Sequence, residues 1–156
     1  MLYPSSIIKN KNICRAEYTD MIFDNIKTID EYALYYAFNN CTEITSVSFP
    51  ELISIGSVGL YNAFKNCTGI TSVSFPKLTS IGTSGLYYAF DTCTRITSIS
   101  FPELTSIGSY GLNNAFYRCN GITEMHFRAD AQSAVEAATG YSSKFGATNA
   151  TIYFDL

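Results

Sequence analysis

The sequence predicts an α/β solenoid, a right-handed stack of about five strand–turn–short-helix units with a cap at each end. Three observations predict this fold. Four copies of one pattern follow each other at a constant interval, marked by Ile44, Ile70, Ile96 and Ile122, and a degenerate copy precedes them. Within each copy, the period of the apolar residues changes from that of a strand to that of a helix. One copy alone could not bury its apolar side, so neighbouring copies must stack to form a common core.

The first half of each copy is predicted to be extended. The segment Ser46-Val47-Ser48-Phe49 alternates polar and apolar residues, which places Val47 and Phe49 inside. Pro50 follows and suits a strand end, because it has no N–H to donate. Equivalent segments begin near residues 18, 44, 70, 96 and 122, and a second extended piece such as "LTSIG" follows them.

The second half of each copy is predicted to be a short helix. Leu60, Ala63, Phe64 and Cys67 lie at i, i+3, i+4 and i+7, which is one stripe of a helix. The same stripe recurs in the other copies: Leu34, Ala37, Phe38, Cys41; Leu86, Ala89, Phe90, Cys93; Leu112, Ala115, Phe116, Cys119.

A solenoid needs terminal units that shield its core from water. We assign residues 1–17 to an N-terminal cap, residues 18–127 to the repeats and residues 128–156 to a C-terminal cap. In the C-terminal cap, residues 130–139 are expected to form a helix with Asp130 as N-cap and Gly140 after its end. The final segment "ATIYFDL" is expected to be a closing strand.

The stretch "ITSISFPELTSIGSYGLNNAFYRCNGITEM" resembles the BspA-type leucine-rich repeats of bacterial surface proteins. The resemblance covers roughly residues 18–127, where the apolar, Pro, Gly, Ala-Phe and Cys positions recur together. The copies are longer than the common unit of that family, and they lack the Asn that many leucine-rich repeats carry after the strand. The ending "FGATNATIYFDL" is similar to the C-terminal segments of gut-bacterial or phage-associated repeat proteins. The resemblance implies a leucine-rich-repeat-like solenoid and a surface protein that contacts host or microbial proteins.

The composition argues against several classes of partner. The net charge is −3 and there is no basic cluster, which disfavours nucleic acid and anionic membrane surfaces. No apolar run approaches the ~20 residues of a membrane span, so membrane insertion is not expected. The first residues show no signal-peptide pattern. The resemblance to BspA-type repeats implies an extracellular or cell-surface location as part of a larger protein, and the lack of a signal-peptide pattern makes a cytoplasmic location the alternative.

The cysteines form the most regular chemical feature. Cys41, Cys67, Cys93 and Cys119 recur at one point of the pattern and should stack ~4.8 Å apart. A straight ladder cannot surround one zinc ion tetrahedrally, so we interpret them as buried structural thiols. Metal binding and disulfide bonding are the alternatives. Cys14 lies outside this column and is expected to be exposed.

Nothing in the sequence indicates catalysis. His126, the only histidine, points outward beside Glu124, and such a pair could act in acid–base chemistry or as half a metal site. No nucleophile or third ligand lies in register, so we interpret it as a solvated pair on the last strand. We predict no enzyme activity, no catalytic residue, no metal site and no cofactor.

A partner surface is predicted where the copies differ, since invariant positions are those that the fold requires. The variable positions on the helix side are rich in tyrosine and include arginine, residue types that are enriched in interface hot spots. The competing interpretation is that the tyrosines only pack edge-on between helices. The predicted partner-binding residues are Tyr35, Tyr36, Tyr61, Asn62, Tyr87, Tyr88, Arg95, Tyr117 and Arg118.

The function predicted first is a non-enzymatic protein-binding or adhesion module of a bacterial cell-surface protein. The alternative is a phage or mobile-element protein that binds and inhibits a host enzyme or complex. A third, weaker hypothesis is carbohydrate binding by the tyrosines.

Overall fold

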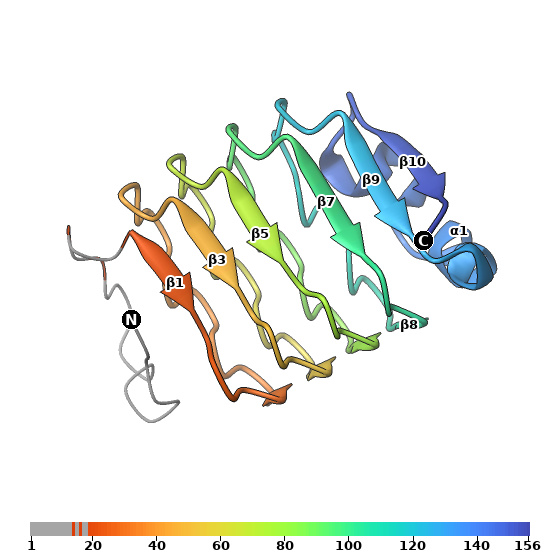
Figure 1. Ribbon diagram of the computed structural model, residues 1–156, viewed down its shortest axis with the longest axis horizontal. Helices are drawn as coiled ribbons and strands as arrows, with labels where there is room; N and C mark the ends of the chain where they lie inside the picture. Colours follow the sequence, from red (N-terminus) through yellow and green to blue (C-terminus); the bar gives the residue numbers. More distant parts are fainter. Residues whose placement is uncertain (1–13, 15, 17–18) are drawn as a thin grey trace.

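A computed structural model describes residues 14, 16 and 19–156 of the chain. The predicted N-terminal cap at 1–17 lies outside these residues apart from Cys14 and Ala16. The remaining chain winds into stacked coils, one for each copy of the repeat, and the solenoid fold is confirmed (Figure 1).

Two rows of parallel strands run along the stack. Strands of successive repeats pair position by position, so that Val47 lies opposite Met21 and Val73. The exception is between β5 and β7, where the first row divides into two three-stranded sheets. All five predicted strand positions carry a strand, and β10 adds a sixth by pairing with β9. The first row contains β1 (Asp20–Ile22), β3 (Ser46–Ser48), β5 (Ser72–Ser74), β7 (Ser98–Phe101), β9 (Glu124–Phe127) and β10 (Thr151–Phe154). The second row contains β2 (Thr28–Ile29), β4 (Ser54–Ile55), β6 (Ser80–Ile81) and β8 (Ser106–Ile107).

The segments predicted as short helices are instead runs of tight turns, which we call the turn segments. A residue with positive φ recurs every four positions, as at Val58 (57°), Asn62 (51°) and Asn66 (61°). Alternate N–H groups donate three residues back within the same coil, as from Ala63 to Leu60 O at 3.0 Å. The N–H groups between them donate to the next coil, as from Phe64 to Ala89 O at 2.8 Å.

The spacing of the coils explains this correction. Packed α-helices need 8–10 Å between their axes, whereas paired strands lie about 4.8 Å apart. Because both rows of strands fix the coils at strand spacing, helices on the third side could not fit side by side. The flat turns fit, and they still bury the predicted Leu-Ala-Phe-Cys stripe, as Leu60, Ala63, Phe64 and Cys67 show.

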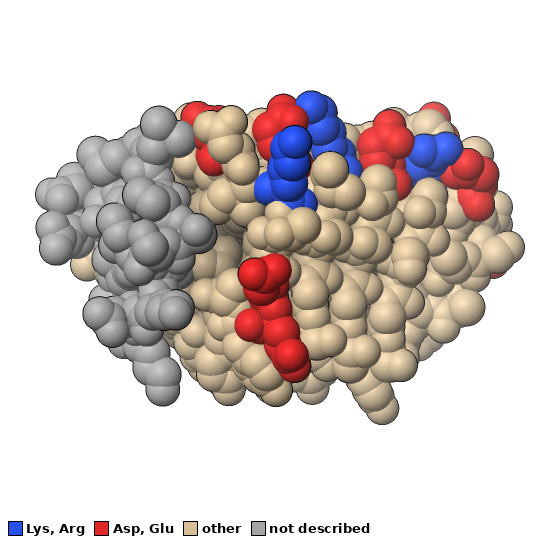
Figure 2. All heavy atoms as spheres, turned by 90° about the horizontal axis from the view of Figure 1, so that it is seen from below, with Lys and Arg blue, Asp and Glu red and all other residues tan. Residues whose placement is uncertain are grey.

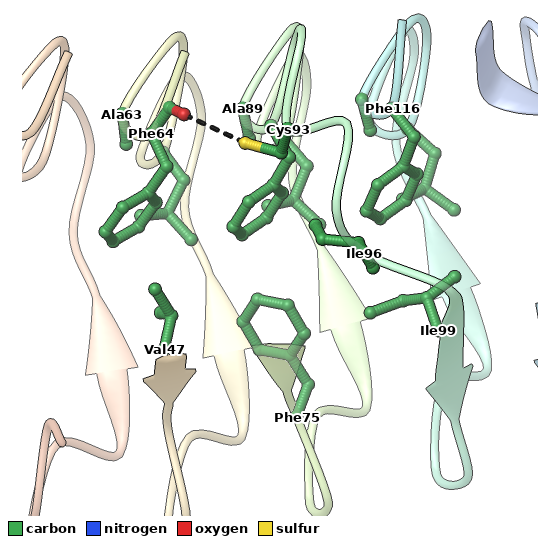
Figure 3. Packing of buried hydrophobic residues seen from close by; sticks show 14 of the residues in the cluster. Val47, Ala63, Phe64, Phe75, Ala89, Cys93, Ile96, Ile99 and Phe116 are labelled. Carbon is green, nitrogen blue, oxygen red and sulfur yellow. Dashed lines mark hydrogen bonds between the residues drawn. The ribbon is translucent and has the colours of Figure 1, made fainter. Parts of the chain in front are cut away.

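One core fills the space between the strand rows and the turn segments. Its residues include two columns of phenylalanine, and Figure 3 shows members of both in the middle of the stack. Neighbouring rings in each column are nearly parallel, such as Phe64 and Phe90 with centroids 5.3 Å apart. The two columns also meet edge to face, as Phe75 and Phe90 do at 6.3 Å. The columns are Phe23, Phe49, Phe75, Phe101, Phe127 and Phe38, Phe64, Phe90, Phe116.

Residues 128–156 remain our proposed C-terminal cap. The helix there is shorter than predicted: a 3-10 turn (Ala129–Ala131) leads into α1 (Gln132–Ala137). Asp130 does not cap the helix but lies within the 3-10 turn, where its carboxylate accepts two bonds from Arg128 at 2.8 Å. Gly140 follows the helix with a φ of 94°. The 3-10 segment Tyr141–Gly146 then leads to β10 and buries Phe145.

Candidate interaction surface: a tyrosine ladder

Tyrosines stack on one another along the turn segments. Tyr35, Tyr61 and Tyr87 occupy the same position in three successive coils, so the repeat places their rings one above the other. The ring centroids of Tyr35 and Tyr61 are 5.3 Å apart, and those of Tyr61 and Tyr87 are 5.0 Å apart. All three side chains are partly exposed, and the stacking covers both faces of the middle ring, Tyr61.

Four further tyrosines extend this stack at both ends. At the N-terminal end, Tyr36 and Tyr32 meet Tyr35 edge to face at 4.6 and 6.0 Å. At the other end, Tyr88 meets Tyr87 at 4.7 Å, and Tyr117 meets Tyr88 at 5.6 Å. We call the seven residues the tyrosine ladder: Tyr32, Tyr35, Tyr36, Tyr61, Tyr87, Tyr88 and Tyr117.

The structure thus brings the six predicted tyrosines into one surface and adds Tyr32. Tyr32 is 58% exposed, the largest value among the large hydrophobic residues of the described chain. Its column also contains Val58, Ser84 and Tyr110, so comparison of the copies could have found it. The prediction used the variable positions beside the repeated Leu and Cys residues, and the column of Tyr32 is not one of these.

The three other predicted residues differ in their accessibility. Arg118 is exposed and lies over the ring of Tyr117, with 4.8 Å between its Cζ and the ring centroid. Arg95 is exposed but makes no ring or hydrogen-bond contact with the ladder in the described part of the chain. Asn62 is only 5% exposed, and its Oδ1 has no hydrogen-bond partner among the described residues. A partner could therefore touch the two arginines but not Asn62.

An ion cluster centred on one buried carboxylate lies at the C-terminal half of the ladder. The carboxylate of Asp91 is fully buried and contacts Lys65 Nζ at 3.1 Å and Arg118 Nε at 3.4 Å. Lys65 comes from the preceding coil and Arg118 from the following one. Lys65 Nζ also lies 5.7 Å from the ring centroid of Tyr88. The sequence analysis did not include Lys65 and Asp91 in this surface, because a sequence pattern does not show which charges pair across coils.

The phenol hydroxyls of the ladder are hydrogen-bond donors. Burial raises the pKa of Tyr61, and the neighbouring tyrosines Tyr36 and Tyr87 raise it further. The phenol therefore stays protonated at neutral pH and can donate a hydrogen bond. At the C-terminal half, the amide of Asn114 donates to the Tyr88 hydroxyl at 3.1 Å, which fixes that phenol in place.

Several other charges of the described chain pair away from the ladder. Lys77 contacts Glu51 at 2.8 Å, and Arg128 bridges Glu103 and Asp130. Figure 2 views the molecule from below Figure 1 and shows side chains of both signs beside one another along one border of that face. Such mixed, paired charges give little net attraction for a charged partner.

The cysteine column is not uniform. Cys41 forms a disulfide with Cys14, with 5.0 Å between their Cα atoms, so the interpretation of Cys41 as a free thiol was wrong. Cys67, Cys93 and Cys119 are buried and free, as predicted. Each of these thiols donates to a phenylalanine carbonyl of the preceding coil, as Cys93 does to Phe64 O at 3.2 Å (Figure 3).

The different state of Cys41 has a physical reason. The other three thiols each find a carbonyl acceptor one coil earlier, whereas Cys41 belongs to the first described coil and pairs with the segment before it. Burial raises the pKa of Cys67 to about 12, as it does for Cys119, so these thiols stay protonated and unreactive. In residues 14, 16 and 19–156, no group of three His, Cys, Asp or Glu side chains is arranged to hold a metal ion.

A family model describes this arrangement of repeats. The model of the BspA type leucine-rich repeat region, which contains six copies, matches residues 7–145. The chain belongs to this family. Leucine-rich repeats are typically non-enzymatic scaffolds that mediate protein interactions, and this BspA-type protein is built from such repeats.

A solved structure shares the fold of the BspA-type protein. It is the crystal structure of a leucine rich cell surface protein from Faecalibacterium prausnitzii, with 20% sequence identity and a TM-score of 0.56. The match covers 96% of the present chain and 33% of that protein, so the chain spans about a third of the length of its structural relative. Among curated proteins, none matches the sequence. None of the helices in the described residues has the length and apolar character to cross a membrane.

On the strand side of the BspA-type protein, His126 joins two acidic side chains. Its Nδ1 lies 2.9 Å from Asp155 Oδ1, and its Nε2 lies 3.5 Å from Glu124 Oε2. The Tyr153 ring stacks on the imidazole with centroids 5.0 Å apart. The sequence predicted the contact with Glu124 but not the one with Asp155. Asp155 follows β10, and nothing in the sequence indicates that β10 pairs with β9.

This cluster predicts a small pH dependence of stability. The hydrogen bond to Asp155, with help from Glu124, raises the pKa of His126 above its ordinary value of about 6.5. Its stabilising charge is therefore fully present below pH 6.5 and is lost as the pH rises through the raised pKa of the folded state. We expect urea unfolding to show a loss of about 0.5 kcal/mol over this window, the size of a surface ion pair.

The variant His126→Gln is the control for this prediction. It should unfold with the same free energy on both sides of the window. An equal pH dependence in the variant and the parent protein would show that another group is responsible.

Proposed function

We propose that this BspA-type protein is a non-enzymatic module that captures protein partners at the bacterial cell surface through the tyrosine ladder. The ladder is the observation that carries the proposal. Seven phenols form one continuous surface along the turn segments, and four of the large hydrophobic side chains that stay exposed, Tyr32, Tyr35, Tyr110 and Tyr117, lie on these segments. Tyrosines bury much area on binding and lose little conformational entropy.

The disulfide supports a location outside the cytoplasm. Bonds such as Cys14–Cys41 form and persist in oxidising compartments, whereas cytoplasmic thiols are kept reduced. The structural relative from Faecalibacterium prausnitzii is a cell surface protein. Both observations favour the surface module over an inhibitor that acts inside a host cell.

The geometry of the rings favours a protein partner over a carbohydrate. Sugars stack on exposed aromatic faces, but Tyr35, Tyr61 and Tyr87 stack on one another at 5.0–5.3 Å, which covers both faces of Tyr61 and one face of each of its neighbours. Their hydroxyls and edges remain available, and these groups suit peptide carbonyls and apolar side chains.

Alanine at Tyr61 and Tyr87 tests the proposal. Loss of two central phenols should weaken capture about tenfold or more, since hot-spot truncations cost at least about 1–2 kcal/mol. The measurement is quantitative capture of proteins from host-cell and bacterial surface extracts on the immobilised parent protein, followed by titration of the identified partner against each variant.

The matched control places two changes on the opposite face, Ser72→Lys and Ser98→Lys, which are both exposed on the first strand row. Circular dichroism and thermal unfolding check that every variant stays folded. Binding that survives the tyrosine changes but is lost with the lysines would move the site to the strand face.

A further inference from the structure

The exposed charges on the later turn segments are all of one sign. Residues 57–69, 83–95 and 109–121 contain three exposed or partly exposed charged side chains, which are Lys65, Arg95 and Arg118. The one acidic residue among them, Asp91, is fully buried. Because the whole chain has a net charge of −3, this surface differs in sign from the rest of the molecule.

The buried carboxylate holds two cations at the surface. The side chain of Asp91 is 0% exposed, while those of Lys65 and Arg118 are 32% and 58% exposed. Asp91 also accepts a bond from the Thr92 hydroxyl at 2.8 Å, which occupies part of its accepting capacity. One carboxylate cannot use the three donors of an ammonium and the five of a guanidinium. Two positive charges and one negative charge leave an excess of one positive charge on side chains that are partly exposed.

Tyrosines hold both cations in position. Lys65 lies over the ring of Tyr88 and Arg118 lies over that of Tyr117, and these two rings contact each other at 5.6 Å. Side chains that are already ordered lose less entropy when they bind a ligand. The result is a prepared group of donors at the C-terminal half of the ladder.

We propose that this group binds a carboxylate from an acidic peptide segment of the protein partner, between Lys65 and Arg118. Guanidinium and ammonium groups form strong, short hydrogen bonds with carboxylates. The first turn segment supports the same assignment by its opposite sign, since Glu31 and Glu43 are exposed there and the exposed Asp30 directly precedes it. Repulsion at that end orients the acidic segment toward the later coils. The inference rests on the proposed function and adds the chemistry of the partner.

Short synthetic peptides test this proposal without knowledge of the partner. A capped tetraglutamate peptide is titrated into the ¹⁵N-labelled protein, and amide and guanidinium shifts are followed by NMR. We expect shifts centred on Lys65, Tyr88 and Arg118 that fall at least threefold in 0.5 M NaCl. A capped tetraglutamine peptide of the same length should produce no such shifts.

Charge-matched variants complete the test. The double variant Lys65→Gln/Arg118→Gln should lose the tetraglutamate shifts at Tyr88, while Lys27→Gln/Lys77→Gln, with the same loss of charge elsewhere, should keep them. Equal shifts from tetraglutamine, shifts centred elsewhere, or no shifts would overturn the proposal. Larger shifts from an acidic oligosaccharide such as oligogalacturonate would also overturn it, in favour of a glycan.

The two proposals can fail separately. Loss of the tetraglutamate response would leave the dependence of partner capture on Tyr61 and Tyr87 unaffected. Capture that ignores Tyr61 and Tyr87 would remove the proposed ladder function, even if tetraglutamate still bound between Lys65 and Arg118.

Discussion

Replacement of Phe90 by alanine is expected to lower the free energy of unfolding by about 3–5 kcal/mol, the cost of removing a buried aromatic ring and leaving a cavity. Phe90 has no exposed surface and contacts rings on three sides. It stacks on Phe64 and Phe116 at 5.3 and 5.7 Å and meets Phe75 edge to face. Because it lies in a middle coil, its loss weakens the interfaces with both neighbouring coils. Urea unfolding followed by circular dichroism measures the change.

Two variants bracket this prediction. Phe90→Leu retains most of the buried volume and should cost less than half as much. Tyr110→Ala removes a ring of similar size that is 51% exposed and should change stability by less than about 1 kcal/mol. A loss below about 1 kcal/mol for Phe90→Ala would contradict the continuous phenylalanine core.

Replacement of Cys14 by serine is expected to destabilise the protein by about 3 kcal/mol. The disulfide with Cys41 closes a loop whose ends are 27 residues apart, and its loss gives the unfolded chain more freedom. For a chain of this length, the midpoint of thermal unfolding should fall by roughly 6–12 °C. Differential scanning calorimetry with and without reductant measures the change.

The reductant supplies the internal control for this prediction. It should destabilise the parent protein by the same amount and leave the Cys14→Ser variant unchanged. Thiol titration after unfolding should find three free thiols in the oxidised parent protein, those of Cys67, Cys93 and Cys119, and five after reduction. Five thiols before reduction would contradict the disulfide.

The repeat pattern predicted the solenoid because each contact recurs at one spacing. Alternation around Val47 and Phe49 identified the strand and its buried face, and five such segments identified the row. The same reasoning was wrong for the backbone of the turn segments. An apolar spacing of three and four also fits a chain with a left-handed residue at every fourth position, such as Asn62. Side-chain burial was therefore predictable, and the backbone hydrogen bonds were not.

Contacts outside the repeat could not be predicted from spacing. Cys14 lies in no copy, so no register relates it to Cys41. Asp155 reaches His126 only because the last strand pairs with β9 after the intervening cap. The tyrosines were predicted because they occupy repeated columns, whereas the pairing of Lys65 with Asp91 occurs once and depends on the geometry of neighbouring coils.

Paired residues of neighbouring repeat strands are one repeat length apart in the sequence. This limits which insertions and deletions in the gene leave the fold intact. Duplication or deletion of one whole copy preserves the contacts between coils, because each coil still packs against a coil with equivalent residues. Gain or loss of a single codon inside a copy breaks the backbone match with the coils before and after it. Recombination between nearly identical copies is thus a permitted route to variation, and it would lengthen or shorten the row of phenols in steps of one coil.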